Sequence, residues 1–181
     1  MEGDELLPAL RKGDEMSDIA DNIADLMVRE LNGFRLEIEL FPDDESIWRT
    51  LPGVTNSAAN LAMHVAGNLQ HYAGAVLGGN GYVRHRDVEF GRRSGTKAEV
   101  IAEIDAAIRA VDQVIPGLAA ERLRAIYPET VIAGKEIRTE LFLLHLCSHA
   151  AYHLAQAGYL RRIMFGDTRA SGAMSLAALI G

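Results

Sequence analysis

Residues 141–160, LFLLHLCSHAAYHLAQAGYL, decide the fold of this chain. No Asp, Glu, Lys or Arg interrupts the stretch, and its apolar residues recur at helical spacing. This pattern predicts a buried helix over about 138–165. Its length approaches that of a membrane span, but three histidines, a serine, a glutamine and two tyrosines argue against contact with lipid.

Three histidines of this helix stand one above another, because His145, His149 and His153 follow at intervals of four. They interrupt the apolar side that should face the core, where a polar ring is costly unless something satisfies it. The cost points to a binding site. Imidazoles at 149 and 153 can reach one metal ion from a single helix.

Three more helices are expected upstream. Ser17 is a plausible cap for a first helix over roughly 18–40, and a second starts after Thr55, Asn56 or Ser57 and ends near Leu77. The third runs from a capping box at Thr96 and Glu99 to Ile115. Four helices with one long crossover loop predict an all-α four-helix bundle.

The connections and ends are less regular. The segment 81–95, GYVRHRDVEFGRRSG, reads as a charged surface loop that forms the crossover. Residues 117–137 fit either a short hairpin or an irregular excursion. We therefore expect a leader over 1–17 that is loosely ordered, one bundle over 18–165 and a C-terminal tail over 166–181.

The second helix offers the partner for the histidine pair. It lacks charged residues from Ser57 to Leu77, and His64 shares a face there with Asn60, Asn68 and His71. Two polar faces on charge-free helices are expected to enclose a polar chamber within the bundle, where bundles usually hold cofactors. His64 would then be the third ligand.

Three neutral imidazoles bind Zn²⁺ or Ni²⁺ well and leave a position open for water or substrate. The predicted metal ligands are His64, His149 and His153. Asn68, Tyr152 and Gln156 are expected around them, to orient ligands or substrate. The role of His145 stays open: it could replace His149 as a ligand, bridge to substrate or be a satisfied core residue.

Composition narrows the class of protein. The chain of 181 residues has 49% hydrophobic residues and a formal net charge of −7, which disfavours nucleic acid and anionic membranes as partners. One cysteine, Cys147, excludes an intramolecular disulfide and suits a reducing compartment, so a cytoplasmic protein is expected. The charge-free outer surfaces of the second and fourth helices favour a homodimer.

Two stretches carry a family resemblance: NSAANLAMHVAGNLQHYAGAVLGG over 56–79 and LLHLCSHAAYHLAQAGYLRRI over 143–163. Together with the helix order, they make residues 18–165 resemble the DinB/YfiT-like superfamily of metal-dependent four-helix-bundle proteins. In that family, a histidine of the second helix and an HxxxH pair of the fourth bind a divalent metal. The match places these ligands at the same three histidines. The usual H-x-G-Q ending has Ala155 in place of glycine.

The resemblance implies a metal-dependent enzyme that uses a low-molecular-weight thiol, such as mycothiol, bacillithiol or glutathione. On this reading the chain is a thiol transferase or a hydrolase. The metal would hold a thiolate or water and deliver it to a small electrophile, so the sequence names no catalytic side chain. Two alternatives stay open: a metal-binding bundle that is structural or sensing, and a metal-free helical interaction protein.

Overall fold

The computed structural model describes residues 15–130, 134–171 and 175–179. Residues 1–14 of the predicted leader lie outside this range. The elements in chain order are α1 Glu15–Leu40, η1 Ser46–Trp48, α2 Ala58–Leu69, η2 Gln70–Leu77, α3 Arg86–Gly91, α4 Lys97–Val114, α5 Ala120–Arg124, α6 Thr139–Phe165 and η3 Leu176–Leu179. No strand occurs among the residues described, so the predicted all-α class is confirmed.

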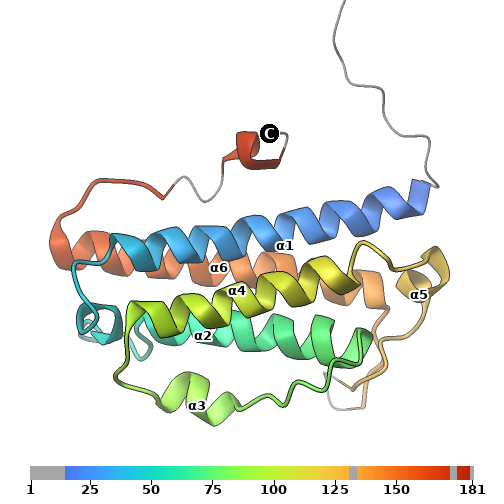
Figure 1. The fold of residues 1–181 in the computed structure, drawn as a ribbon, viewed down its shortest axis with the longest axis horizontal. Helices are drawn as coiled ribbons and strands as arrows, with labels where there is room; N and C mark the ends of the chain where they lie inside the picture. Colours follow the sequence, from blue (N-terminus) through green and yellow to red (C-terminus); the bar gives the residue numbers. More distant parts are fainter. Residues whose placement is uncertain (1–14, 131–133, 172–174, 180–181) are drawn as a thin grey trace, which may run out of the picture.

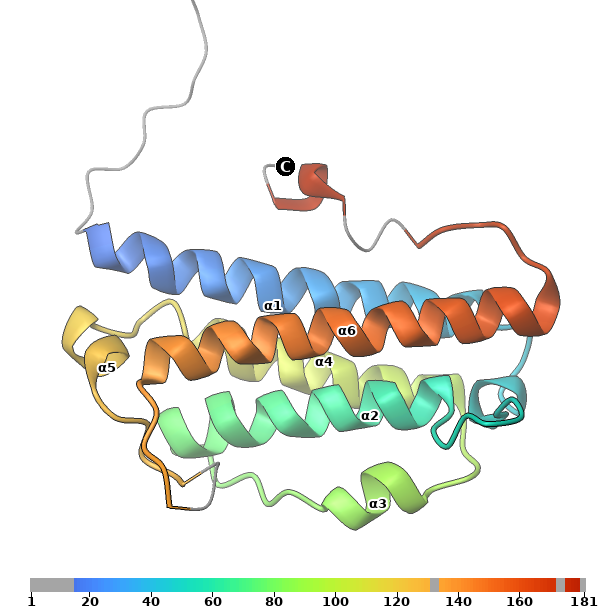
Figure 2. The same cartoon turned by 180° about the vertical axis from the view of Figure 1, so that it is seen from behind.

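The four long helices α1, α2, α4 and α6 form the bundle (Figures 1 and 2). α1 packs against α4 and α6, and α2 packs against the same two helices, so α1 and α2 occupy diagonal corners. The space between them is filled by buried apolar side chains, among them Met27, Phe34, Leu69 and Ile104. The predicted helical bundle is therefore the observed architecture.

The helix boundaries follow from local sequence. Ser57 caps α2 and Thr96 caps α4. Both positions form full capping boxes, in which the side chain of the third helical residue accepts a hydrogen bond from the backbone N–H of the cap residue. α6 ends at Gly166, whose φ of 61° is a left-handed conformation that suits glycine.

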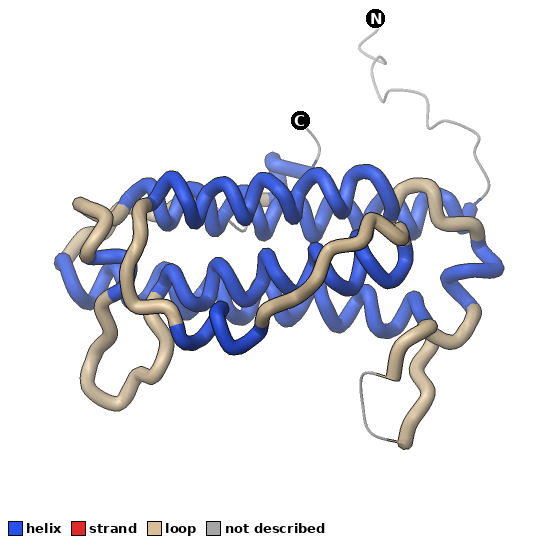
Figure 3. Tube along the Cα trace, turned by 60° about the horizontal axis from the view of Figure 1, so that its bottom comes forward, coloured by secondary structure: helices blue, strands red, loops and turns tan. Residues whose placement is uncertain are grey.

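The crossover between η2 and α4 is more structured than expected. The segment predicted as a charged surface loop contains α3, which packs on α2, and Figure 3 shows it running across the front of the bundle. As a result every residue of α2 is buried. The purely surface description was wrong because Glu89 of α3 points inward and is buried.

Two further segments depart from regular α-helix. α2 continues into η2, a π-helix, a form frequent near functional sites. The excursion before α6 contains α5 and one antiparallel bridge between Ile126 and Arg138, so its two described arms are paired at one point, as in a short hairpin, and residues 131–133 lie outside the description. None of the helices within the described residues is long and apolar enough to cross a membrane.

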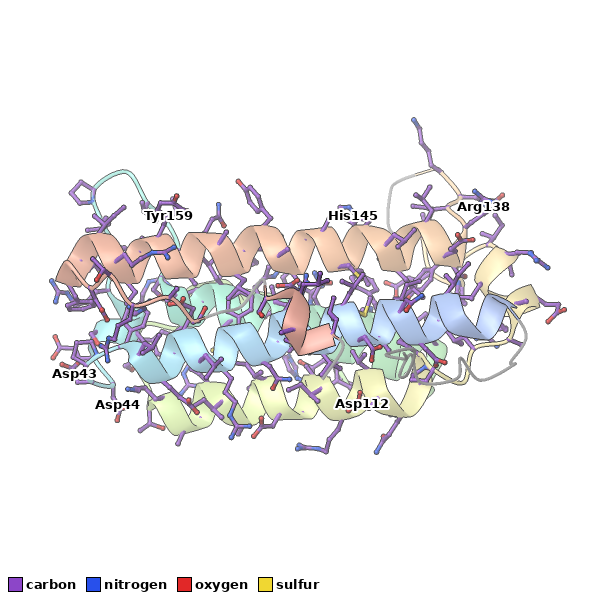
Figure 4. All side chains as sticks on the ribbon, turned by 90° about the horizontal axis from the view of Figure 1, so that it is seen from above. Asp43, Asp44, Asp112, Arg138, His145 and Tyr159 are labelled. Atoms are coloured by element: carbon purple, nitrogen blue, oxygen red, sulfur yellow. The ribbon has the colours of Figure 1, made fainter. Side chains whose placement is uncertain are left out.

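The outward side of α6 carries several exposed large apolar side chains. Its exposed side chains include Leu141, Tyr152, Tyr159 and Ile163, and Figure 4 shows Tyr159 along the edge of α6 that faces away from α1. The corresponding surface of α2 is covered by this chain itself. The homodimer stays a prediction, and α6 is the one of these two helices that still offers it an open apolar surface.

Candidate metal centre

The three predicted ligands come together between α2 and α6. The Nε2 atoms of His64 and His149 are 3.3 Å apart, and those of His149 and His153 are 3.2 Å apart. The spacing of four on α6 stacks two rings, and the facing turn of α2 brings the third. Each histidine offers one nitrogen within 4.8 Å of the others, so the group could hold a metal ion.

The Nδ1 atoms of His64 and His153, which point away from the triad, each already have a hydrogen-bond partner. His64 Nδ1 lies 2.9 Å from Glu89 Oε2, and His153 Nδ1 lies 2.8 Å from Gln156 Oε1. A carboxylate and an amide oxygen only accept, so each Nδ1 carries the proton and donates it. The Nε2 lone pairs of His64 and His153 therefore both face the Nε2 of His149. This donor set fits a metal ion.

The third ring is held differently. Asn68 Oδ1 accepts from Arg84 Nη1 at 3.3 Å, which leaves the amide nitrogen 3.4 Å from His149 Nδ1. In this orientation Asn68 is the donor, so His149 carries its proton on Nε2, between the other two lone pairs. Binding an ion through Nε2 requires the other tautomer, in which Nδ1 is the donor.

Burial favours the neutral form of the His149 and His153 rings. Burial, followed by the neighbouring His153 and His64, lowers the pKa of His149 to about 3. Burial and His64 also lower the pKa of His153, although the hydrogen bond to Gln156 works the other way. Neutral imidazole is the form that binds metals, so near pH 7 protons do not compete strongly for the nitrogens of His149 and His153.

Glu89 supports His64 from behind. Its oxygens accept from Arg84 Nε at 2.7 Å and Arg84 Nη2 at 2.8 Å, and Asn60 Nδ2 donates to its backbone carbonyl at 2.9 Å. Burial raises the pKa of Glu89, but the hydrogen bonds from Arg84 and His64 outweigh it and hold that pKa below its usual value. Glu89 is therefore an anion at neutral pH.

A glycine makes room for this carboxylate. A Cβ on Gly67 would lie 2.4 Å from Glu89 Oε1, so a larger residue would displace it. The sequence interpretation placed neither Glu89 nor Arg84 in the site. The available signals were a glycine one turn beyond His64 on α2 and an Arg–Glu pair in the crossover, and neither specifies a contact across 25 residues.

The remaining predicted residues separate. Gln156 and Asn68 touch the ligands, whereas Tyr152 is 63% exposed and reaches His153 only through a ring contact at 5.3 Å. His145 is exposed, so its interpretation as a satisfied core residue was wrong. It lies on the outward side of α6 and not on the side that packs into the core (Figure 4).

Cys147 and His71 take no part in the triad. The Cys147 thiol is buried, and its sulfur lies 3.7 Å from the carbonyl oxygen of Ile23 on α1. His71 instead pairs with Glu129 at 2.8 Å.

A cavity of about 480 Å³ opens beside the triad. His64 and His149 line it, together with Asn68, Tyr72, Arg84, Arg86, Ile137, Leu141, Phe142, His145 and Leu146. The expected polar chamber inside the bundle is therefore wrong in position: apolar residues fill the centre, and the histidines lie between α2 and α6 near the surface, with His149 and His153 half-buried.

Comparison with known proteins gives one result that bears on identity. No match was found among curated proteins. A family model, the DinB superfamily, matches residues 27–157, which is well over half of the chain and includes all three histidines. The match spans most of the bundle from α1 to α6. The chain belongs to the DinB superfamily.

Proposed function

We propose that this protein is a metal-dependent enzyme in which His64, His149 and His153 hold a divalent ion, most readily Zn²⁺ or Ni²⁺, for attack by a thiol or water on a small electrophile. The observation that supports it most is the convergence of three Nε2 atoms, two of them lining a cavity. Cavities of this size suit small molecules.

The protein residues have separable roles in this proposal. When bound, a divalent ion supplies Lewis-acid chemistry that favours the deprotonated form of a thiol or water beside it. Glu89 keeps the Nδ1 proton of His64 in place, and Gln156 does the same for His153. These contacts orient the rings and keep their Nε2 atoms available as ligands.

The nucleophile has to come from outside the chain. Burial, with Glu30 nearby, raises the pKa of the Cys147 thiol to about 12, so it remains protonated at neutral pH. Its sulfur also contacts α1 rather than the cavity. A low-molecular-weight thiol or a water molecule could enter the cavity beside His64 and His149.

The test starts from protein purified without a histidine tag and without added metal. Elemental analysis should find about one divalent ion per chain, and the loaded protein should consume thiol, or hydrolyse substrate, with members of a broad electrophile panel. His153→Ala should strongly weaken metal binding and abolish turnover. His71→Ala, which changes a histidine outside the triad, is the matched control and should change neither.

Two outcomes separate the alternatives. If the ion binds stoichiometrically and raises the melting temperature but no thiol or ester is consumed, the protein is a metal-binding bundle without catalysis. If no ion binds and the His153→Ala variant behaves like the unmodified protein, the metal proposal fails altogether.

A further inference from the structure

We propose that the cavity beside the triad binds a small organic anion, with a carboxylate facing Arg86 and an apolar body against α6. This names the substrate class of the site and in that respect rests on the proposed function. The argument uses the lining of the cavity, the pairing of its two arginines and the position of Phe90.

Two arginines, Arg84 and Arg86, are among the residues that line the cavity, and none of the lining residues is Asp or Glu. The whole chain has a formal net charge of −7. A cavity of the opposite sign on an acidic protein attracts an anion that the rest of the surface repels.

The two arginines differ in whether their guanidinium groups are already paired with a carboxylate. Arg84 is paired with Glu89 through two nitrogens and also donates to Asn68. Arg86 has no carboxylate within 4.0 Å among the described residues. Its guanidinium is therefore the group able to bind a ligand carboxylate through two parallel hydrogen bonds.

Phe90 ties this guanidinium to the triad. The Arg86 guanidinium lies over the Phe90 ring at 5.0 Å, and the same ring lies 4.5 Å from the ring of His64. A cation over an aromatic face is attracted to it. This attraction keeps the Arg86 side chain beside the cavity, although the residue is exposed to solvent. The anion site is thus one aromatic ring away from a predicted metal ligand.

The apolar side chains that line the cavity indicate what the uncharged part of the ligand should be. Leu141, Phe142 and Leu146 of α6 and Ile137 before it present apolar groups to the cavity. A fully hydrated inorganic ion would leave this wall unused. An anion with a hydrocarbon or aromatic body would bury it and at the same time place its charged end at Arg86.

The experiment compares benzoate with benzamide, which differ in charge and little in shape. Binding is measured by NMR titration of metal-free protein, so that a metal ion cannot itself hold the carboxylate. Benzoate should bind about tenfold more tightly than benzamide. Shifted resonances should belong to residues of this cavity, such as Tyr72 and Leu146.

Three variants test the role of the charge. Arg86→Met should remove the preference for benzoate, whereas Arg86→Lys should retain part of it because the positive charge remains. Arg109→Met makes the same charge change at an exposed position of α4 that does not line the cavity, and should keep the preference. Each variant is first checked for an unchanged melting temperature.

Equal binding of benzoate and benzamide would overturn the proposal, as would an unchanged preference in Arg86→Met. A preference lost equally in Arg109→Met would overturn it too, since only general charge attraction would remain. Because the titration uses metal-free protein, it can succeed even if the loaded protein shows no turnover. The cavity proposal and the enzyme proposal therefore fail by different results.

Discussion

Two arginine–carboxylate pairs, one fully buried and one partly buried, have opposite characters. In the first, Arg161 of α6 is fully buried and donates to Glu37 of α1 at 2.6 Å, to Asp167 at 2.7 Å and to the carbonyl of Arg169 at 2.7 Å. This network closes on itself, because each guanidinium nitrogen has a partner. It fastens the segment after α6 to α1.

In the second pair, Glu89 accepts hydrogen bonds from Arg84 and also from His64 Nδ1. The other nitrogen of His64, Nε2, faces two more imidazoles. That network ends in nitrogen lone pairs near a cavity. Breaking a closed, buried network leaves an unpaired charge, which destabilises the fold. A network that ends in convergent nitrogen lone pairs has the donor set of a metal site, so the two networks allow different predictions.

Arg161→Met should have the largest effect on stability. It leaves Glu37 as a buried, unpaired carboxylate, which costs about 3–5 kcal/mol of unfolding free energy. Urea unfolding measures the loss. Metal stoichiometry should stay the same in the fraction that remains folded. A loss no greater than that of a surface substitution would show that the first network is not structural.

His149→Ala removes one of the three predicted metal ligands at the end of the second network. Removing one of three ligands should weaken metal binding by on the order of 10²–10³-fold, about 3–4 kcal/mol. Competition with a chromophoric chelator measures the affinity. Unfolding free energy of the metal-free protein should fall far less than in Arg161→Met. Unchanged affinity would remove His149 from the ligand set.

Glu89→Gln tests the support behind His64. The amide can still accept from His64 Nδ1 but carries no charge, so metal affinity should fall by roughly 10–100-fold. The same chelator competition applies, with the exposed Glu121→Gln as the matched control. If both variants bind equally well, Glu89 does not act on the centre.

Asn68→Asp should work in the other direction. A carboxylate can accept from Arg84 and from the Nδ1–H of His149 at once, so the tautomer required for metal binding is favoured. Metal affinity should rise by about three- to tenfold. A fall in affinity would mean that the present amide orientation already suits the bound state.

Cys147 should matter least, because it belongs to neither network. With its pKa raised to about 12 from 9.0, its thiolate fraction near pH 8 is about a thousandfold lower than in unfolded chain. Alkylation by iodoacetamide should be slow until the pH approaches the raised pKa or urea is added. Rapid alkylation at pH 8 would contradict the burial of this thiol.

The long helices could be predicted because their signals are local. The capping box at Thr96, the cap candidates over 55–57 and the apolar periodicity of α6 depend on neighbours a few residues away. The triad was equally accessible, since a spacing of four stacks His149 on His153. What failed depends on how helices rotate against one another: the centre lies near the surface, and His145 falls outside the core.

The support of the centre could not be predicted for the same reason. Glu89 meets His64 only because α3 is laid across α2 by the crossover, and no periodicity encodes that path. The irregular course before α6 is similarly set by tertiary contacts, such as the hydrogen bond from Tyr127 to the carbonyl of Tyr72 on the π-helix. Long-range geometry, rather than residue type, was missing.

The pairing of His64 with His149 has a consequence in polymer terms. The two residues are 85 positions apart in the chain, so an ion bound by both closes a long loop in any state that keeps it. A cross-link over a loop of this length lowers the entropy of the unfolded chain by an amount worth about 4–5 kcal/mol at room temperature. A divalent ion held at these histidines would in this sense be a reversible cross-link, which a chelator would open without breaking a covalent bond.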